Sequence, residues 1–250
     1  MLACLALPVF AGSQEEAPRR HAPESIIKFA KQTEHYLAEQ GAYVACLDIN
    51  LDKAIATADS IRGLGGSSDA GHLDIVDANA VNSSLSNIYA DHGSLDIVVC
   101  TPGVNVRKRL IEYTDEEIDL VLGVNLKGAF FCSRAARAAL NDGDGGEIVM
   151  TSSVAGLAGT GSSIAYCASK AGLNALTEAL MQEVRHDKIR VSCILPGSVD
   201  TEFAGNEPSP ETSWRLTSSD VARAVLDLIH HPARSLPSRV ELRPSTPRKK

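Results

Sequence analysis

The 250-residue sequence lacks several features that would each point to a particular class of protein. It has no apolar run that approaches the roughly 20 residues of a membrane-spanning helix, so we expect no membrane partner. Its seven histidines form no cluster, and its six cysteines show no Cys-x-x-Cys spacing, so we expect no bound metal. With a formal net charge of −7, the chain also lacks the basic excess of a nucleic-acid-binding protein.

The cysteines and the first dozen residues bear on the compartment in which the protein works. The cysteines lie mostly inside apolar segments, which is typical of small buried side chains in a reducing compartment. The apolar start, MLACLALPVFAG, has neither the basic beginning nor the small-x-small cleavage site of a secretory signal peptide. We therefore expect a cytoplasmic protein.

Helical and strand-like segments alternate along the chain between residues 24 and 245. The expected helices cover residues 24–40, 52–64, 79–92, 114–141, 163–186 and 218–230. Short apolar runs typical of buried strands cover residues 42–48, 72–75, 95–100, 148–150, 189–195 and 239–243. This alternation predicts one α/β domain, a doubly wound parallel sheet in three α/β/α layers, and 250 residues suit a single domain of this kind. We divide the chain into an atypical N-terminal segment (1–23), which could supply a first strand and an insertion, the domain (24–245) and a basic tail (246–250).

Polar residues and glycines follow the predicted strands. In doubly wound sheets, ligands bind beyond the carboxyl ends of the strands, which all meet at one edge. The residues at these exits are Asp48, Asp74, Thr101 to Gly103, Ser152 with Ser153, and Pro196 with Gly197. We therefore expect the ligand site at this edge.

The segment from Glu147 to Gly172 carries the clearest chemistry. A short apolar strand stops at the hydroxyl run 151–153, and a helix containing Tyr166 and Lys170 follows. Because residues four apart lie one helical turn apart, the phenol and the ammonium share one face. A free phenol has a pKa of about 10 and needs a nearby cation to serve as an acid or base near neutral pH. Lys170 supplies that cation, and Ser153 can hold a carbonyl or alcohol oxygen against the phenol.

These residues together resemble the active-site segment of the short-chain dehydrogenase/reductase family. Ser153 precedes Tyr166 by thirteen residues, as the family serine does, and the resemblance covers residues 24 to 245. It implies a Rossmann-like fold and an oxidoreductase that acts on a small-molecule alcohol or carbonyl substrate. In that setting Tyr166 exchanges a proton with the substrate oxygen, Lys170 lowers the pKa of the tyrosine and binds ribose hydroxyls, and Ser153 orients the oxygen.

The segment GVNLKGAFF at 123–131 resembles the family's helix motif and places Asn125 at the fourth catalytic position. The resemblance implies that an Asn there bends the helix and holds a water that links the lysine to a proton relay. The alternative is structural, with Asn125 a buried helix amide whose partners are backbone groups.

Several further residues are implied by the resemblance as cofactor contacts. LPGSVDTEF at 195–203 resembles the family's Pro-Gly motif, in which Val199 and Thr201 touch the nicotinamide carboxamide. Asp48 occupies the place of the acidic residue that binds the adenosine ribose, which favours NAD over NADP; a solvent-exposed strand-end aspartate is the alternative. The remaining expected contacts are Asp74 and Ile75 around the adenine, Gly103 in CTPG, and Pro196 with Gly197.

The family's glycine-rich turn, Thr-Gly-x-x-x-Gly-x-Gly, is missing. Its three glycines would fall on Glu24, Lys28 and Ala30, all of which carry a Cβ. One alternative takes LALPVFAGS as the first strand and Gly12 as the first glycine, with arginines 19 and 20 binding phosphate by charge. In the other, the segment is divergent and the phosphate cradle is absent.

We expect an NAD-dependent oxidoreductase with a secondary alcohol or ketone as substrate. The ending VELRPS is similar to that of members labelled 3-oxoacyl-carrier-protein reductase-like. A catalytically impaired homologue acting as a binding or oligomerisation partner is the alternative, and an epimerase or dehydratase is disfavoured because those proteins resemble longer chains. The helices at 114–141 and 163–186 correspond to those that pair across subunits in the family, which implies a homodimer or homotetramer.

Overall fold

The computed structural model describes residues 2–7, 24–141, 145–200 and 212–247. The strands are β1 (Leu2–Leu7), β2 (Tyr43–Asp48), β3 (Ser67–His72), β4 (Ile97–Pro102), β5 (Gly146–Thr151), β6 (Ile189–Pro196) and β7 (Arg239–Leu242). The α-helices are α1 (Glu24–Glu39), α2 (Leu51–Gly63), α3 (Ala78–His92), α4 (Asp115–Leu122), α5 (Ala129–Asn141), α6 (Ile164–Val184) and α7 (Ser218–Ile229). The short helical segments are η1 (Leu110–Glu112), η2 (Gly123–Gly128), η3 (Val154–Gly156) and η4 (Arg185–Asp187).

The strands form a single sheet in the order β3-β2-β1-β4-β5-β6-β7, with every pair parallel. The order reverses at β1 and β4, which is the topological switch point of a doubly wound sheet. Because every strand runs the same way, all the carboxyl ends meet at one edge. The predicted Rossmann-like α/β fold is therefore confirmed.

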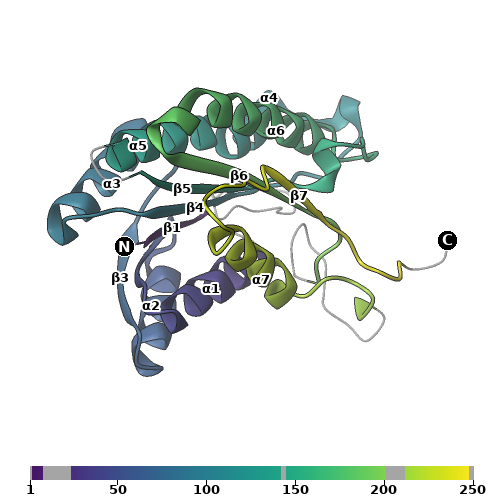
Figure 1. The fold of residues 1–250 in the computed structure, drawn as a ribbon. Helices are drawn as coiled ribbons and strands as arrows, with labels where there is room; N and C mark the ends of the chain where they lie inside the picture. Colours follow the sequence, from purple (N-terminus) through teal and green to yellow (C-terminus); the bar gives the residue numbers. More distant parts are fainter. Residues whose placement is uncertain (1, 8–23, 142–144, 201–211, 248–250) are drawn as a thin grey trace.

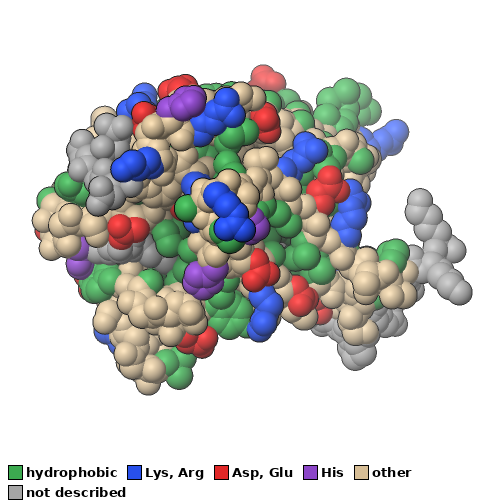
Figure 2. All heavy atoms as spheres, in the orientation of Figure 1, with side chains coloured by type: hydrophobic (Ala, Val, Ile, Leu, Met, Phe, Trp, Pro, Cys, Tyr) green, Lys and Arg blue, Asp and Glu red, His purple; other side chains and the backbone are tan. Residues whose placement is uncertain are grey.

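Helices cover both faces of the sheet, as Figure 1 shows, with α3 to α6 on one side and α1, α2 and α7 on the other. Each face has its own apolar core. The core under α3 to α6 includes Leu85, Val121 and Leu173, whereas the opposite core includes Leu37 and Ile61. The inner strands β2, β4, β5 and β6 are largely buried on both faces, which explains why they are mostly apolar runs in the sequence. On the molecular face drawn in Figure 2, basic and acidic side chains are intermixed.

The sheet includes residues of the predicted N-terminal segment. The strand β1 lies between β2 and β4, with Leu2 opposite Val44 on one side and Ile97 on the other. A first strand thus precedes the helix that begins at residue 24, and it starts three residues before the segment LALPVFAGS. Gly12, Arg19 and Arg20, which are the candidate phosphate-binding residues in the sequence, lie outside the described residues.

The strand predicted at residues 72–75 is wrong. The observed β3 ends at His72, and Leu73 and Ile75 follow it as fully buried side chains in a connection. Their apolar character reflects burial rather than strand structure. The true strand, SSDAGH, has weak strand propensity and is specified by its pairing with β2, which is a tertiary effect.

The helix predicted at residues 114–141 is interrupted at its middle. It begins as expected with a capping box in which Thr114 and Glu117 bind each other's backbone amides. The π-helical segment η2 then separates α4 from α5 and contains Asn125. Gly128 in this segment lies against Ile75, since a Cβ there would come within 2.7 Å of the isoleucine side chain. The π-helical segment therefore packs closely onto the connection that follows β3.

Candidate active site

The strand β5 and helix α6 bring three of the predicted catalytic residues to the carboxyl edge of the sheet. Ser153 follows β5 and caps the short helix η3, whereas Tyr166 and Lys170 lie one turn apart in α6. The two elements are joined directly because the Lys170 ammonium donates a hydrogen bond to the Thr151 carbonyl, at 2.9 Å. Gly156 allows η3 to lie against α6, since a Cβ there would come within 2.7 Å of the Lys170 backbone.

The phenol of Tyr166 lies in a largely apolar environment. The residue is only 9% exposed, and burial raises its pKa to about 12. A hydrogen bond from Ser153 and the charge of Arg107 oppose this rise. The Lys170 ammonium is 5.8 Å from the centre of the phenol ring. In this structure, burial therefore outweighs the cations, and the pKa of Tyr166 is raised rather than lowered as the sequence predicts.

Burial has the opposite effect on Lys170 because it disfavours the charged form of each group. The residue is 2% exposed, and burial lowers its pKa to about 8. Its hydrogen bond to the Thr151 carbonyl holds the ammonium near the end of β5. The two shifts therefore move the pKa values apart: that of the phenol rises from 10.0 to about 12, and that of the ammonium falls from 10.5 to about 8.

The side chain of Asn125 is fully buried and bonded to backbone. Its Oδ1 accepts from the Val104 amide at 2.7 Å, and its Nδ2 donates to the Val104 carbonyl at 2.9 Å. The Nδ2 also donates to Ser169 Oγ at 2.9 Å, and Ser169 in turn donates to the Tyr166 carbonyl. This amide has the backbone partners of the structural alternative, and it also links the segment after β4 to the helix that carries Tyr166.

Asp48 lies at the carboxyl end of β2, one strand away from the switch point. It is 3% exposed, so the alternative of a solvent-exposed aspartate is wrong. Burial raises its pKa to about 7, although the Asn50 amide donates to the carboxylate at 2.7 Å and Lys53 also favours the charged form. Because burial disfavours the charged carboxylate, further hydrogen-bond donors would stabilise it. Such a carboxylate at the end of a strand is suited to binding hydroxyl groups.

The residues expected around the adenine follow β3. Asp74 Oδ1 accepts from the Val76 amide at 3.0 Å. Ile75 is only 1% exposed and packs into the core, so its backbone is the part that can reach a ligand.

The remaining predicted cofactor residues lie at the ends of β4 and β6. Gly103 follows β4 and is buried. Pro196 ends β6, and the amide of Gly197 donates to the Leu242 carbonyl at 2.7 Å, which ties this exit to β7. Val199 forms an isolated bridge with Leu216. Thr201 lies outside the described residues.

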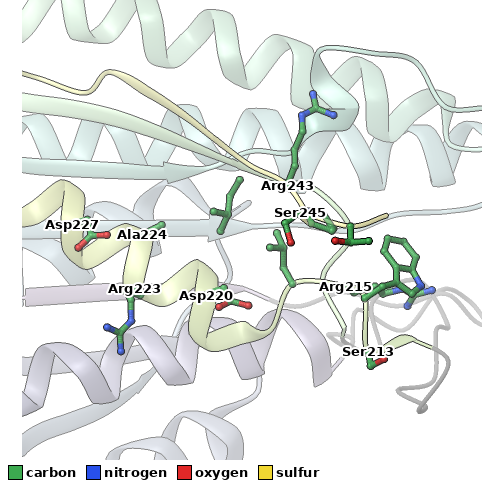
Figure 3. Close-up of a pocket in the computed structure, with 13 residues that line it drawn as sticks. Ser213, Arg215, Asp220, Arg223, Ala224, Asp227, Arg243 and Ser245 are labelled. Atoms are coloured by element: carbon green, nitrogen blue, oxygen red, sulfur yellow. The ribbon is translucent and has the colours of Figure 1, made fainter. Parts of the chain in front are cut away.

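Two arginines at this edge were missed by the sequence prediction. Arg215 lines a cavity of about 690 Å³ between α7 and the segment that follows β7, drawn in Figure 3. Its Nε and Nη1 are buried and have no hydrogen-bond partner among the described residues, and no sequence signal marks Arg215. Arg107 is exposed, and its charge acts on the phenol of Tyr166, where it opposes the rise in pKa. The run Arg-Lys-Arg at 107–109, directly after a strand exit in an acidic chain, is a signal that could have identified it.

The structure also bears on the predicted absence of metal and membrane partners. Within the described ranges, no group of three or more His, Cys, Asp and Glu side chains is placed to hold a metal ion. In the same part of the chain, no helix combines the length and the apolar character needed to cross a bilayer.

Comparison with known proteins gives one consistent family. A family model described as short chain dehydrogenase matches residues 29–212. The oxidoreductase YxbG of Bacillus subtilis is 34% identical over 170 residues, which are 68% of this chain and 62% of that protein. The subunit BbsD of (2S)-[(R)-hydroxy(phenyl)methyl]succinyl-CoA dehydrogenase from Thauera aromatica is 32% identical over 187 residues, 75% of each chain. The 3-oxoacyl-[acyl-carrier-protein] reductase FabG of Thermotoga maritima is 28% identical over 193 residues, 77% of this chain and 78% of that protein.

Solved structures agree in fold. An alcohol dehydrogenase from the archaeon Thermococcus sibiricus, complexed with 5-hydroxy-NADP, has a TM-score of 0.81 at 25% identity and covers 89% of this chain and 94% of its own. A metagenomic short-chain oxidoreductase in complex with NADP has a TM-score of 0.77 at 27% identity, covering 88% and 93%. The fold and the polar residues at the switch point thus define a nucleotide-binding Rossmann-like protein. The chain belongs to the short chain dehydrogenase family of oxidoreductases. The family match begins at residue 29, so two of the three positions expected for the glycine-rich turn, Glu24 and Lys28, lie outside it, whereas Ala30 lies just inside.

Proposed function

We propose that this protein is a nicotinamide-dependent oxidoreductase that interconverts a secondary alcohol and a ketone. The observation that carries the proposal is the joint placement of Ser153, Tyr166 and Lys170 at the carboxyl edge of the sheet. A serine, a phenol and an ammonium at this place form a proton-transfer site for an oxygen whose carbon is oxidised or reduced.

Tyr166 acts as the acid in ketone reduction. With a pKa of about 12, its phenol is protonated at neutral pH and can donate its proton to the carbonyl oxygen as the alcohol forms. Ser153 donates a hydrogen bond that stabilises the phenolate left behind, and Lys170 adds a positive charge at the same face of α6. In alcohol oxidation, the Tyr166 phenolate takes the proton up, and Ser153 and Lys170 stabilise that phenolate before the transfer. Asn125 holds α6 in place through Ser169, and a role in a proton relay remains a prediction.

The residues at the edge fit a nicotinamide dinucleotide. Asp48 offers a buried carboxylate that ribose hydroxyls can stabilise by donating hydrogen bonds, and we propose that Lys170 binds the hydroxyls of the second ribose. The backbone after β3, β4 and β6, at Asp74, Ile75, Gly103, Gly197 and Val199, supplies the other contacts that we propose. When bound, the nicotinamide ring supplies or accepts the hydride at the substrate carbon.

We propose that NAD is preferred to NADP. A carboxylate at the end of β2 repels a 2′-phosphate and accepts hydrogen bonds from free ribose hydroxyls. The two similar structures named above hold NADP or its 5-hydroxy derivative, so the preference rests on Asp48 alone.

The substrate is a small alcohol or carbonyl compound. Similarity to FabG raises a 3-oxoacyl thioester as one member of this class. A homodimer or homotetramer formed by the helices from residue 114 to 141 and by α6 remains part of the proposal. The alternative of a catalytically impaired binding partner gains no support, because the catalytic residues lie together.

The test is a calorimetric titration of the purified protein with NADH and, separately, with NADPH. Saturable binding with NADH preferred is the expected result, and Asp48→Ala should reduce that preference. A folded protein that binds neither cofactor would overturn the proposed function.

A further inference from the structure

A short basic run lies at the exit of β4 in an otherwise acidic chain. Arg107, Lys108 and Arg109 follow the strand within a few residues, whereas the whole chain has a formal net charge of −7. Positive charge at the mouth of a cleft attracts anions from solution. Each cation of the run can bind a ligand only if its side chain is free of other charged partners and lies near the site.

The segment from residue 104 to 108 is held rigidly. Asn125 binds both backbone groups of Val104, and the Lys108 amide donates to the Ser162 carbonyl at 2.9 Å. The Asn105 side chain donates to Ser163 Oγ at 3.3 Å. Because residues 162 and 163 directly precede α6, these bonds place the segment beside the first turn of the helix that carries Tyr166.

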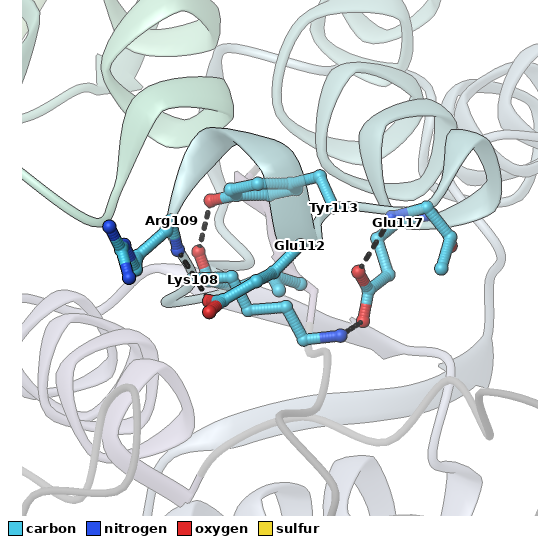
Figure 4. Close-up of polar contacts among 7 residues, drawn as sticks. Lys108, Arg109, Glu112, Tyr113 and Glu117 are labelled. Carbon is cyan, nitrogen blue, oxygen red and sulfur yellow. Dashed lines mark hydrogen bonds and ion pairs between the residues drawn. The ribbon is translucent and has the colours of Figure 1, made fainter.

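The three cations of the run differ in their partners. Figure 4 shows that Lys108 reaches Glu117, at 2.6 Å, which neutralises its charge. Arg109 binds Glu112 through its backbone amide, and its side chain extends away from this group of residues. The Tyr113 hydroxyl donates to the Val106 carbonyl at 2.5 Å, which fixes the residue before Arg107.

Arg107 is exposed, and within the described part of the chain no hydrogen bond or ion pair engages its side chain. It is near enough to Tyr166 for its charge to favour the phenolate. An exposed guanidinium on a backbone segment that is held beside the first turn of α6 is suited to hold an anionic group of the molecule that reacts there.

We propose that Arg107 binds an anionic group, a carboxylate or a phosphate, on the substrate and thereby selects acidic alcohols and ketones over neutral ones. This inference rests on the proposed function, because it assigns the substrate class of the same site. Arg107 is a specificity residue in this scheme, and it leaves the proton transfer to Tyr166.

The test uses two matched pairs of probes. The first pair is acetoacetate and its neutral ethyl ester, and the second is dihydroxyacetone phosphate and dihydroxyacetone. Binding of each probe is measured by calorimetry with and without NADH, and turnover is followed by NADH oxidation. The proteins are the wild type, Arg107→Met and the control Arg109→Met, each checked for an unchanged thermal midpoint.

We expect the wild type to bind the charged member of at least one pair about tenfold or more tightly than its neutral counterpart, as a charge-assisted hydrogen bond provides. The pair that shows the preference identifies carboxylate or phosphate. Arg107→Met should abolish the preference, mainly through affinity or KM, and Arg109→Met should keep it.

Three results would overturn the inference. The first is that neither pair shows a charge preference, and the second is that Arg107→Met retains the preference. The third is that Arg107→Met and Arg109→Met lose the preference equally, which would mean that the overall positive charge of the run, and not Arg107 itself, attracts the anion. A charge preference that depends on Arg107 in a protein unable to bind NADH or NADPH would instead overturn only the proposed function.

Discussion

Asn125 holds Val104 by both of its backbone groups, with the amide oxygen accepting at 2.7 Å and the amide nitrogen donating at 2.9 Å. The side chain thus replaces a strand partner for the residue that follows β4. Its second donor bond reaches Ser169 in α6, so one buried amide joins three parts of the active site.

Replacing this amide should destabilise the protein. In Asn125→Leu, the Val104 amide and carbonyl are left buried without partners, and we expect the free energy of unfolding to fall by about 2 to 5 kcal/mol. Urea titration measures the change. The control Ser169→Ala removes only one of the three bonds and should cost about 1 kcal/mol. Equal losses in the two variants would show that the bonds to Val104 are not the important ones.

Tyr166→Phe should abolish turnover and leave cofactor affinity nearly unchanged. The variant removes the hydroxyl that exchanges the proton and keeps the buried ring in place. Steady-state kinetics and a cofactor titration measure the two effects. Tyr113→Phe is the matched control, because it removes a hydroxyl that donates to the Val106 carbonyl and should retain most of the activity. Turnover of Tyr166→Phe near the wild-type rate would exclude the proposed role.

Asp48 should give stability a distinct pH dependence. Its pKa is about 7 in the folded protein and 3.8 for the free group, so the folded state holds the proton more tightly. Between about pH 4 and pH 7 the folded state therefore binds more protons than the unfolded state, and stability falls as the pH rises. Asp48→Asn lacks this group. Its free energy of unfolding, relative to the wild type, should rise from about pH 4 to about pH 7 and then level off. If the difference in unfolding free energy between the variant and the wild type did not change over this range, the pKa of Asp48 in the folded protein would not be raised above that of the free group.

The ion pair between Arg190 and Glu147 anchors the opposite end of the sheet. Arg190 donates to Glu147 at 2.6 Å and to the carbonyls of Ile229 and His231 after α7. Burial raises the pKa of Glu147, and Arg190 is the group that opposes this rise. Arg190→Met leaves a buried carboxylate without its partner and should cost about 3 to 5 kcal/mol in urea titration. Adding Glu147→Gln should restore part of the lost unfolding free energy. If it restores none, the destabilisation comes from the lost hydrogen bonds between Arg190 and the carbonyls of Ile229 and His231.

Most of the fold follows from local patterns in the sequence, because central strands such as β4 and β6 are buried on both faces and therefore continuous apolar runs. The edge strand β3 could not be found in this way. Among the described strands only β2 pairs with it, so its sequence carries little of the apolar signal. The buried residues Leu73 and Ile75, which follow it, were therefore mistaken for the strand.

The candidate catalytic residues could be named from the sequence, but their environment could not be predicted from it. The spacing of Ser153, Tyr166 and Lys170 is a local feature of one strand and one helix. The partners of Asn125 are 21 residues before it, at Val104, and 44 residues after it, at Ser169. The raised pKa of Tyr166 depends on its burial by the whole fold. Such effects arise only when distant segments pack together.

The place of β1 also has a consequence for how the protein reaches its folded state. Leu2 pairs with Val44 on one side and with Ile97 on the other, so residues from the start of the chain join two groups of strands that lie far apart in sequence. Until β1 inserts, β2 and β4 each present an unpaired edge that can recruit another chain. Contacts of such long sequence separation form slowly. The assembly of this sheet therefore has a late joining step, and substitutions that weaken β1 should favour aggregation before they affect catalysis.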